Sequence, residues 1–218
     1  MEQAFWHDKW SRKEIGFHLS EAHPWLVRYL DDHPISKEDV VFVPLCGKTL
    51  DIGLFLAQGI EVIANELSET AVIELFEGLA LNPTVSPWNG DGKIYQADNL
   101  TVYVGDFFQL TEKELAGTAL VYDRAAIVAL PLEMRKDYSN KMKQICGQAK
   151  QVLMTLEYDQ EVMAGPPFSV TKQEVKEHYA DQYALTEVIR RDIIEQEPRF
   201  KQKGLPEFIQ ALYELNPK

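Results

Sequence analysis

A glycine turn and a later carboxylate are the residues of this chain best suited to chemistry. Residues 39–51 (DVVFVPLCGKTLD) have the pattern of a buried strand that enters a tight turn at Gly47 and continues into a helix. About twenty residues later, a spacing typical of nucleotide-binding sheets, a second strand ends at Glu66. In such sheets the amides of the first turn face the ligand, and the acid accepts both ribose hydroxyls. The pattern predicts a nucleoside site. Without a G-x-G-x-x-G sequence it does not distinguish S-adenosylmethionine from a dinucleotide.

Two further acids follow predicted strands. Asp106 comes after residues 100–104, where an acid or a neighbouring amide is suited to reading an adenine amino group. The alternative is a turn aspartate that caps the residues after it. Asp123 and Arg124 follow the next strand, at the edge where open α/β sheets bind ligands. A buried Asp–Arg pair with a structural role is the competing interpretation.

Three other features are reactive or apolar. Cys46 places a thiol in the glycine turn, but no histidine lies near it in the sequence, so a buried cysteine is favoured over a nucleophile. The sequence GPPF at 165–168 is a rigid apolar loop suited to lining a flat ring, or simply a turn. Trp6 and Trp10 are four residues apart on one helical face, which indicates core packing or a lid contact.

Composition excludes several classes of partner. The 218 residues carry a net charge of −12, and no basic stripe is present, which argues against nucleic acid and against an anionic membrane surface. No stretch reaches the roughly 20 apolar residues of a membrane span. Two cysteines and five scattered histidines give neither a disulfide framework nor a metal-ligand spacing. We expect a cytoplasmic protein with no metal.

Predicted strands and helices alternate along the chain. This order places the strand-end residues Glu66, Asp106 and Asp123 at one edge of a parallel sheet. Predicted strands are 40–43, 62–65, 94–97, 100–104, 119–122, 151–156 and 185–189. Predicted helices are 24–30, 49–58, 68–79 with Ser68 as N-cap, 132–146, 171–179 and 206–212; residues 82–92 read as a loop. The alternation predicts an α/β protein with a mostly parallel sheet and helices on both faces. We expect one domain over residues 1–218, with helices in 1–35 and the α/β core in 36–218.

Together these segments resemble the thiopurine S-methyltransferase family. The matching pieces are W-H-D-K-W at 6–10, F-H at 17–18, F-V-P-L-C-G-K at 42–48, N-E-L-S-E at 65–69, D-R at 123–124, G-P-P-F at 165–168, and Arg199 with Gly204. They keep the family's order and rough spacing over nearly the whole chain. The P-L-C-G-K turn combined with W-x-x-K-W is the specific part, whereas D-R or G-P-P-F alone is not.

The resemblance implies a Rossmann-like class I methyltransferase fold that uses S-adenosyl-L-methionine and releases S-adenosyl-L-homocysteine. From the alternation of strands and helices we expect a seven-stranded sheet with residues 185–189 antiparallel at the edge, and N-terminal helices that cover the cofactor. Its cofactor contacts carry over to Trp10, Leu45, Glu66, Asp106 and Arg124, with Glu66 on the ribose. Some relatives have serine where this chain has Asp106. Some have glycine where this chain has Ala125, and we expect alanine to be tolerated there.

The resemblance also implies a substrate site. Its substrate contacts carry over to Phe17, Arg124, Pro166, Pro167 and Arg199. An in-line displacement at an activated methyl needs alignment and exclusion of water more than acid–base groups. We therefore expect no dedicated general base and name Asp8 only as a candidate proton acceptor.

Several alternatives stay open. The substrate is a thiopurine or another aromatic or heterocyclic thiol, or else a selenium or tellurium species or a small thiol, in a detoxification role. An NAD-type oxidoreductase on the same sheet and a catalytically silent binding protein are the alternatives in other classes. We expect a monomer that acts on a small molecule.

Overall fold

The computed structural model describes residues 3–16 and 18–218. By its internal contacts the chain divides into two compact units, Met1–Leu120 and Val121–Lys218. The predicted α/β class is confirmed, because helices connect strands that run parallel. The expectation of a single domain over residues 1–218 stays a prediction.

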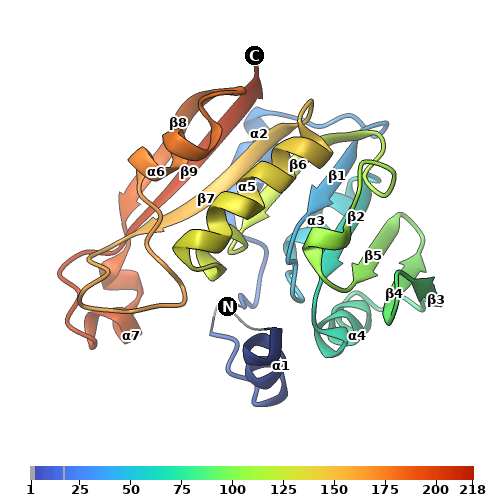
Figure 1. The fold of residues 1–218 in the computed structure, drawn as a ribbon, viewed down its shortest axis with the longest axis horizontal. Helices are drawn as coiled ribbons and strands as arrows, with labels where there is room; N and C mark the ends of the chain where they lie inside the picture. The colour runs from blue at the N-terminus through green and yellow to red at the C-terminus, as the bar shows by residue number, and fades with distance from the viewer. Residues whose placement is uncertain (1–2, 17) are drawn as a thin grey trace. The chain divides into compact units, whose positions relative to one another are not determined.

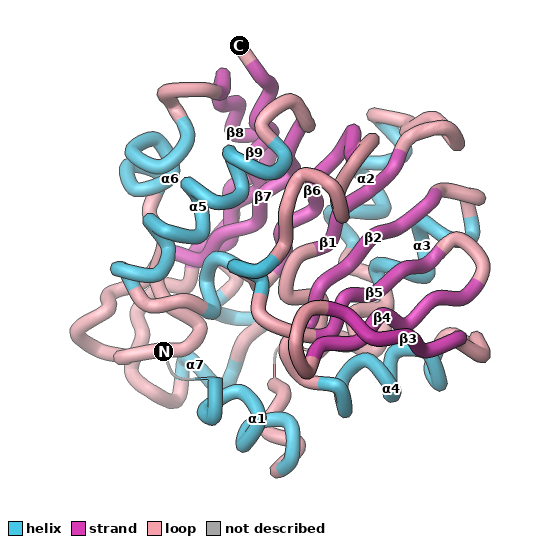
Figure 2. Tube along the Cα trace, turned by 45° about the vertical axis from the view of Figure 1, so that its right-hand side comes forward, coloured by secondary structure: helices cyan, strands magenta, loops and turns pink. Residues whose placement is uncertain are grey.

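Five strands lie in the first unit. They are β1 (Val40–Val43), β2 (Glu61–Glu66), β3 (Thr84–Trp88), β4 (Gly92–Ala97) and β5 (Leu100–Val104). Their order is β3-β4-β5-β2-β1, and Figure 2 shows them side by side. β1, β2 and β5 are parallel, whereas β4 pairs antiparallel with β5 and with β3. The carboxyl ends of β1, β2 and β5 therefore meet at one edge of this sheet.

Helices of the first unit connect and flank these strands. They are α1 (Gln3–Ser11), α2 (Pro24–Asp32), α3 (Asp51–Ala57), α4 (Glu69–Gly78) and the 3-10 turn η1 (Phe107–Gln109). The predicted N-cap is confirmed, since the Ser68 hydroxyl accepts from the Ala71 N–H at the start of α4. α4 packs against β2 and β5, and its apolar residues Val72, Leu75 and Phe76 are buried there.

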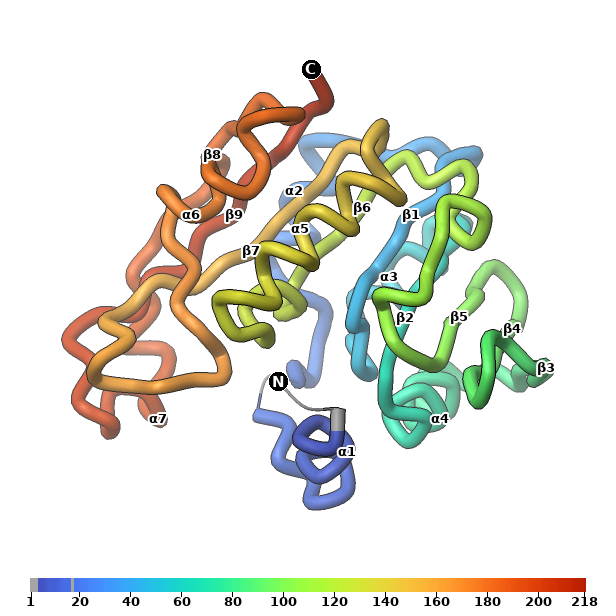
Figure 3. Tube along the Cα trace, in the orientation of Figure 1, coloured from blue at the N-terminus to red at the C-terminus, as the bar shows by residue number. Residues whose placement is uncertain are grey.

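Four strands belong wholly or mainly to the second unit. They are β6 (Thr118–Arg124), β7 (Lys150–Glu157), β8 (Tyr183–Asp192) and β9 (Ile209–Pro217), in the order β6-β7-β9-β8. β9 runs antiparallel to β7 and to β8, as the arrows of Figure 1 show. Figure 3 shows the same three strands side by side. The helices are η2 (Ile127–Ala129), α5 (Leu132–Cys146), α6 (Lys172–Tyr179), η3 (Ile194–Gln196) and α7 (Pro198–Lys201), and α6 packs against α5 and β8.

The predicted count of seven strands is wrong, because the described residues form nine. The first missed strand is β3, within the predicted loop 82–92. It contains Pro87 and is almost entirely exposed, which the edge of a sheet tolerates and which resembles a loop in sequence.

The second missed strand is β9, so the predicted helix 206–212 is also wrong. Phe208, Ala211, Leu212 and Leu215 happen to fit the i, i+3, i+4, i+7 spacing of a helix. In the structure β9 lies between β7 and β8, and its consecutive residues Ala211, Leu212 and Tyr213 are all buried. Because both faces of the strand are covered there, its apolar and polar residues do not alternate cleanly.

Candidate functional site

The turn between β1 and α3 contains two residues in the left-handed backbone region, Leu45 (φ 45°) and Gly47 (φ 53°). Glycine adopts this conformation freely, whereas for a residue with a side chain such as Leu45 it costs about 1–2 kcal/mol. Contacts with β2 hold the turn in place, since the Cys46 N–H donates to the Asn65 carbonyl at 2.9 Å. The tight turn predicted from the sequence is therefore present.

Glu66 ends β2 and is only 6% exposed. Its Oε2 accepts from the Gly47 N–H and its Oε1 from the Ser68 N–H, each at 2.8 Å. Burial raises the pKa of the Glu66 carboxyl, and these backbone hydrogen bonds act in the opposite direction. Since a carboxylate has about four acceptor positions, two such bonds leave it able to accept from a further donor. Glu66 thus couples the end of β2 to the turn after β1.

Asn65 extends this coupling to β5. Its Nδ2 donates to the carbonyls of Tyr103 and Gly105, each at 3.0 Å. Asp106 follows Gly105, and its Oδ1 accepts from the Phe108 N–H at 3.0 Å. The capping role expected of a turn aspartate is therefore present. The adenine contact of Asp106 stays a prediction.

The N-terminal site residues lie on α1 or outside the described part of the chain. Trp10 is buried, and its helix packs against α4, the helix that begins shortly after Glu66. Asp8 is exposed and pairs with Arg12, whose Nε lies 2.9 Å from Asp8 Oδ1. The predicted substrate contact Phe17 lies outside the described residues.

Asp123 and Arg124 form the end of β6. Asp123 is buried, and its carboxylate accepts from the Ile127 N–H at 3.2 Å and from the Tyr138 hydroxyl at 2.7 Å. Burial raises the pKa of Asp123 to about 6, although both hydrogen bonds lower it. Among the ion pairs of the described residues there is none between Asp123 and Arg124, so the structural Asp–Arg pair does not form. Ala125 follows with φ 66°.

The GPPF loop lies between β7 and α6. Gly165 has φ 87°, and a Cβ atom there would lie 2.7 Å from the ring of Phe168, so the loop requires glycine at this position. The bonds that precede Pro166 and Pro167 are both cis. Both prolines are half-buried.

Tyr158, at the end of β7, anchors this loop. Its hydroxyl donates to the Pro167 carbonyl and accepts from Gln160 Nε2. Its N–H donates to Ser169 Oγ at 3.0 Å, and the Ser169 N–H donates to Gln160 Oε1 at 2.8 Å. The Tyr158 ring stacks on Phe208, with 5.6 Å between the ring centres.

Arg199 is on α7, a helix held by an apolar cluster. The cluster consists of Tyr158, Met163, Ile194, Phe200, Leu205 and Phe208. The Arg199 guanidinium lies 4.5 Å from the centre of the Phe200 ring, and its Nε lies 3.0 Å from Glu197. Its side chain remains 47% exposed. Tyr158 therefore connects the loop that carries Pro166 and Pro167 with the segment that carries Arg199.

Two residues of this unit were missed from the sequence: Tyr158 and the buried Arg135 of α5. Both act through contacts with residues distant in the sequence.

Cys46, in the turn after β1, is buried as predicted. Burial, and then the nearby Glu66, raise the pKa of its thiol well above the ordinary range. A neutral buried thiol is unsuited to act as a nucleophile.

The structure shows neither a metal cluster nor a membrane helix within residues 3–16 and 18–218. No group of three or more His, Cys, Asp or Glu side chains there is arranged to hold a metal ion. None of the helices in those ranges has the length and apolar character needed to cross a bilayer.

Sequence comparison relates the whole chain to one family. The family model described as "Thiopurine S-methyltransferase (TPMT)" matches residues 1–218. A thiopurine S-methyltransferase of Pseudomonas paraeruginosa is 40% identical over 216 residues, which cover 99% of both chains. One from Teredinibacter turnerae is 46% identical over 186 residues, or 85% of this chain and 86% of the relative.

Structural comparison finds the same fold in distant proteins. A SAM-dependent methyltransferase from Anabaena variabilis matches with a TM-score of 0.62 at 13% identity, covering 99% of this chain and 95% of the other. The 1,6-didemethyltoxoflavin-N1-methyltransferase of Burkholderia thailandensis, solved with S-adenosylhomocysteine, also gives 0.62, at 15% identity, covering 98% and 87%. At these identities the matches establish the fold, and the predicted class I methyltransferase fold is confirmed.

Proposed function

Because the chain belongs to the thiopurine S-methyltransferase family, we propose that it transfers the methyl group of S-adenosyl-L-methionine to sulfur. The acceptors are thiopurines or other aromatic and heterocyclic thiols, and S-adenosyl-L-homocysteine is the second product. The transfer is a direct in-line displacement, which asks the protein for alignment and exclusion of water.

The observation that carries this proposal is the coupling of Glu66 to the turn after β1. The buried carboxylate holds the Gly47 N–H at 2.8 Å and keeps acceptor capacity on its oxygens. A ribose offers two neighbouring hydroxyl donors, so the chemistry of Glu66 fits this part of S-adenosylmethionine. The side chain of Leu45, at positive φ, occupies a turn where dinucleotide-binding proteins have glycine for the approach of a diphosphate.

Five residues are proposed to hold the cofactor: Trp10, Leu45, Glu66, Asp106 and Arg124. When bound, S-adenosylmethionine supplies a methyl group that its sulfonium already activates. The chain's own task is therefore to bind and orient.

The thiol is proposed to bind between apolar and cationic groups. Phe17, Pro166 and Pro167 line the ring of the substrate, and the anchored loop supports this role for the prolines. Arg124 and Arg199 keep the sulfur as thiolate, because a nearby cation favours the charged form. No dedicated general base is needed for an aromatic thiol that ionises readily, and Asp8 is the candidate proton acceptor.

We also propose a setting for this activity. The enzyme is a cytoplasmic monomer of one domain that acts on small molecules and binds neither nucleic acid nor membranes; its net charge of −12 supports the last point. A selenium or tellurium species, or another small thiol, is the alternative acceptor, and the proposed role is detoxification.

A thermal-shift comparison followed by a transfer assay tests the proposed function. S-adenosylmethionine and S-adenosylhomocysteine should raise the melting temperature, because a ligand at one hundred times its Kd adds about 2.7 kcal/mol to the free energy of unfolding. NAD should not raise it. The protein should then methylate 6-mercaptopurine at sulfur. A shift with NAD alone would favour an oxidoreductase, and binding of S-adenosylmethionine without transfer to any thiol would favour a silent binding protein.

A further inference from the structure

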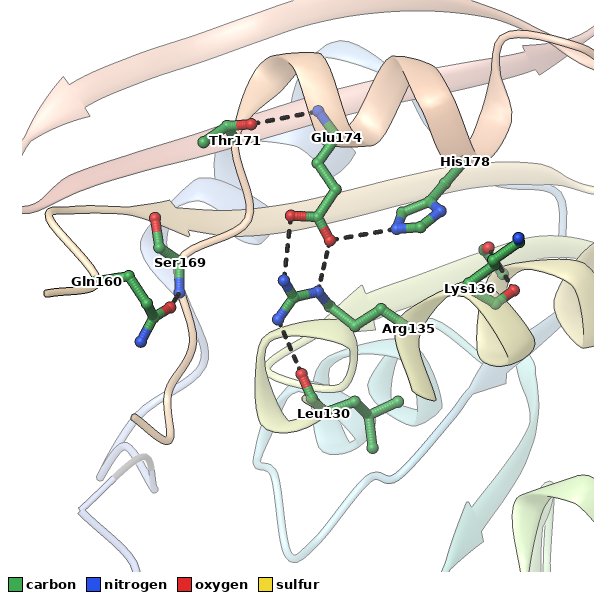
Figure 4. A network of polar contacts seen from close by, with 9 residues as sticks. Leu130, Arg135, Lys136, Gln160, Ser169, Thr171, Glu174 and His178 are labelled. Carbon is green, nitrogen blue, oxygen red and sulfur yellow. Dashed lines mark hydrogen bonds and ion pairs between the residues drawn. The ribbon is translucent and has the colours of Figure 1, made fainter. Parts of the chain in front are cut away.

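Arg135 lies in the first turn of α5, is only 4% exposed, and contacts three separate segments of the second unit. Figure 4 shows its bonds to two of them, at Glu174 and Leu130. Its Nε and Nη2 donate to the two carboxylate oxygens of Glu174, at 2.5 and 3.1 Å. Its Nη1 donates to the Leu130 carbonyl at 2.9 Å. Its Cζ lies 5.9 Å from the centre of the Phe168 ring. One side chain thus joins α6, the segment after β6 and the 165–168 loop.

Each segment is also fixed independently at this point. The Phe168 N–H donates to the Val128 carbonyl at 2.6 Å, so the loop meets the segment after β6 through backbone as well as side chain. Glu174 is held by the Thr171 hydroxyl, which accepts from its N–H at 3.2 Å, and by His178 Nε2 at 3.2 Å from its Oε1 (Figure 4). The partners of Arg135 are therefore in defined positions.

The guanidinium suits this arrangement because its donors form a rigid planar fork. The bidentate pair with Glu174 and the bond to the Leu130 carbonyl together fix the orientation of the Arg135 guanidinium. Its position against the Phe168 ring is therefore fixed as well. Buried ion pairs are often no more stabilising than apolar residues of the same volume. Orientation is therefore what Arg135 supplies and an apolar residue does not.

We propose that Arg135 is a positioning residue for the thiol substrate. It holds the 165–168 loop, and with it Pro166 and Pro167, on the segment that follows β6. This inference rests on the proposed function, in which the two prolines line the substrate pocket. Arg135 acts through the loop, so its loss raises KM for the thiol. Affinity for S-adenosylhomocysteine, which depends on Glu66 and its turn, is retained.

Three variants separate orientation from stability. Arg135→Lys keeps a charge opposite Glu174 and loses the fork. The pair Arg135→Met with Glu174→Met removes both charges, so that neither is left buried alone. Phe168→Leu removes the ring and keeps the ion pair. The matched control is Lys143→Met, which breaks the other ion pair of α5, where Nζ lies 2.9 and 3.2 Å from the Asp181 carboxylate oxygens.

Steady-state kinetics with 6-mercaptopurine and calorimetry with S-adenosylhomocysteine give the result. We expect the two Arg135 variants to raise the KM for the thiol about ten-fold and Phe168→Leu about three-fold, with kcat within about three-fold of wild type. The dissociation constant of S-adenosylhomocysteine should stay within about two-fold, and Lys143→Met should match wild type throughout.

Two results would overturn the positioning role alone while the wild-type enzyme is active. The first is a folded Arg135→Lys variant with wild-type KM. The second is a sign of general destabilisation: either KM rises while kcat and S-adenosylhomocysteine affinity fall in parallel, or Lys143→Met shows the same KM change. If the Arg135 variants do not fold, Phe168→Leu decides by the same criteria. A wild-type protein that methylates no thiol refutes the proposed function, and this inference with it.

Discussion

Replacing Glu66 is the sharpest test of the cofactor site, because its carboxylate has two separable roles. It accepts from the Gly47 and Ser68 N–H groups in the protein itself, and it is proposed to accept from ribose hydroxyls in the complex. Glu66→Ala removes both roles. Glu66→Gln keeps the volume and one acceptor oxygen, but turns an NH₂ group towards one of the two N–H donors.

The expected magnitudes follow from these contacts. Loss of one charge-assisted hydrogen bond to the ligand amounts to about 1.5–3 kcal/mol, so Glu66→Ala should weaken S-adenosylhomocysteine binding by one to two orders of magnitude. Two backbone N–H groups also lose their acceptor. We expect a net loss of stability of about 1–3 kcal/mol, limited because the variant no longer buries a carboxylate. Glu66→Gln should lie between Glu66→Ala and wild type in affinity.

Calorimetry with S-adenosylhomocysteine, together with urea unfolding, measures the two roles separately. Glu61→Ala is the matched control, since Glu61 is exposed at the opposite end of β2 and should change neither quantity. An unchanged dissociation constant in a folded, less stable Glu66→Ala protein would refute the reasoning. Glu66 would then serve only to hold the turn.

Three further predictions concern the end of β6 and the tail. Burial raises the pKa of Asp123 to about 6, against an ordinary 3.8. Between these pH values the folded state holds a proton that the unfolded state has released, so the contribution of Asp123 to stability falls as pH rises from about 4 to about 6. Relative to wild type, Asp123→Asn should therefore gain up to about 3 kcal/mol between pH 4 and 6.5, and pH-independent relative stability in urea unfolding would contradict this. Ala125→Gly should stabilise the protein by about 1 kcal/mol, because φ 66° is strained for alanine; an unchanged melting temperature would count against it. Arg124→Met and Arg199→Met should each lower kcat/KM for thiopurines roughly thirty-fold, about 2 kcal/mol. Calorimetry should show that only Arg124→Met weakens cofactor binding, and two stable variants with wild-type kcat/KM would remove both arginines from the site.

The first unit could be predicted largely from local sequence. A buried strand, a glycine turn and a strand that ends in an acid are each defined by a few consecutive residues, and the parallel pairing of β1 with β2 follows from the helix between them. The hydrogen bond from Gly47 to Glu66 is a consequence of that topology, because both lie at the carboxyl ends of adjacent parallel strands. β3 was missed because an exposed edge strand leaves no apolar periodicity in the sequence.

The second unit was harder to predict, because its site depends on contacts between distant residues. The Asp123 carboxylate pairs with Tyr138 rather than with its neighbour Arg124, and nothing in the sequence near Asp123 indicates this. The Tyr158 hydroxyl contacts Pro167 only because the chain returns after β7. Adjacent residues at a strand end point to opposite faces, so an Asp–Arg pair in sequence is a weak guide to an ion pair.

The burial of Arg135 follows from the periodicity of α5. α5 contains several charged residues, and the spacing of its apolar residues indicates which of them is buried. Its buried residues are Arg135, Tyr138, Ser139, Met142, Ile145 and Cys146, which recur at the i, i+3, i+4, i+7 spacing of one helical face. Arg135 therefore stands at the start of an apolar stripe, whereas Lys136 and Asp137 do not. A charge on such a stripe requires a buried partner of opposite sign, and Glu174 is that partner. The stripe predicts that Arg135 is paired; only the fold identifies the loop that this pair holds.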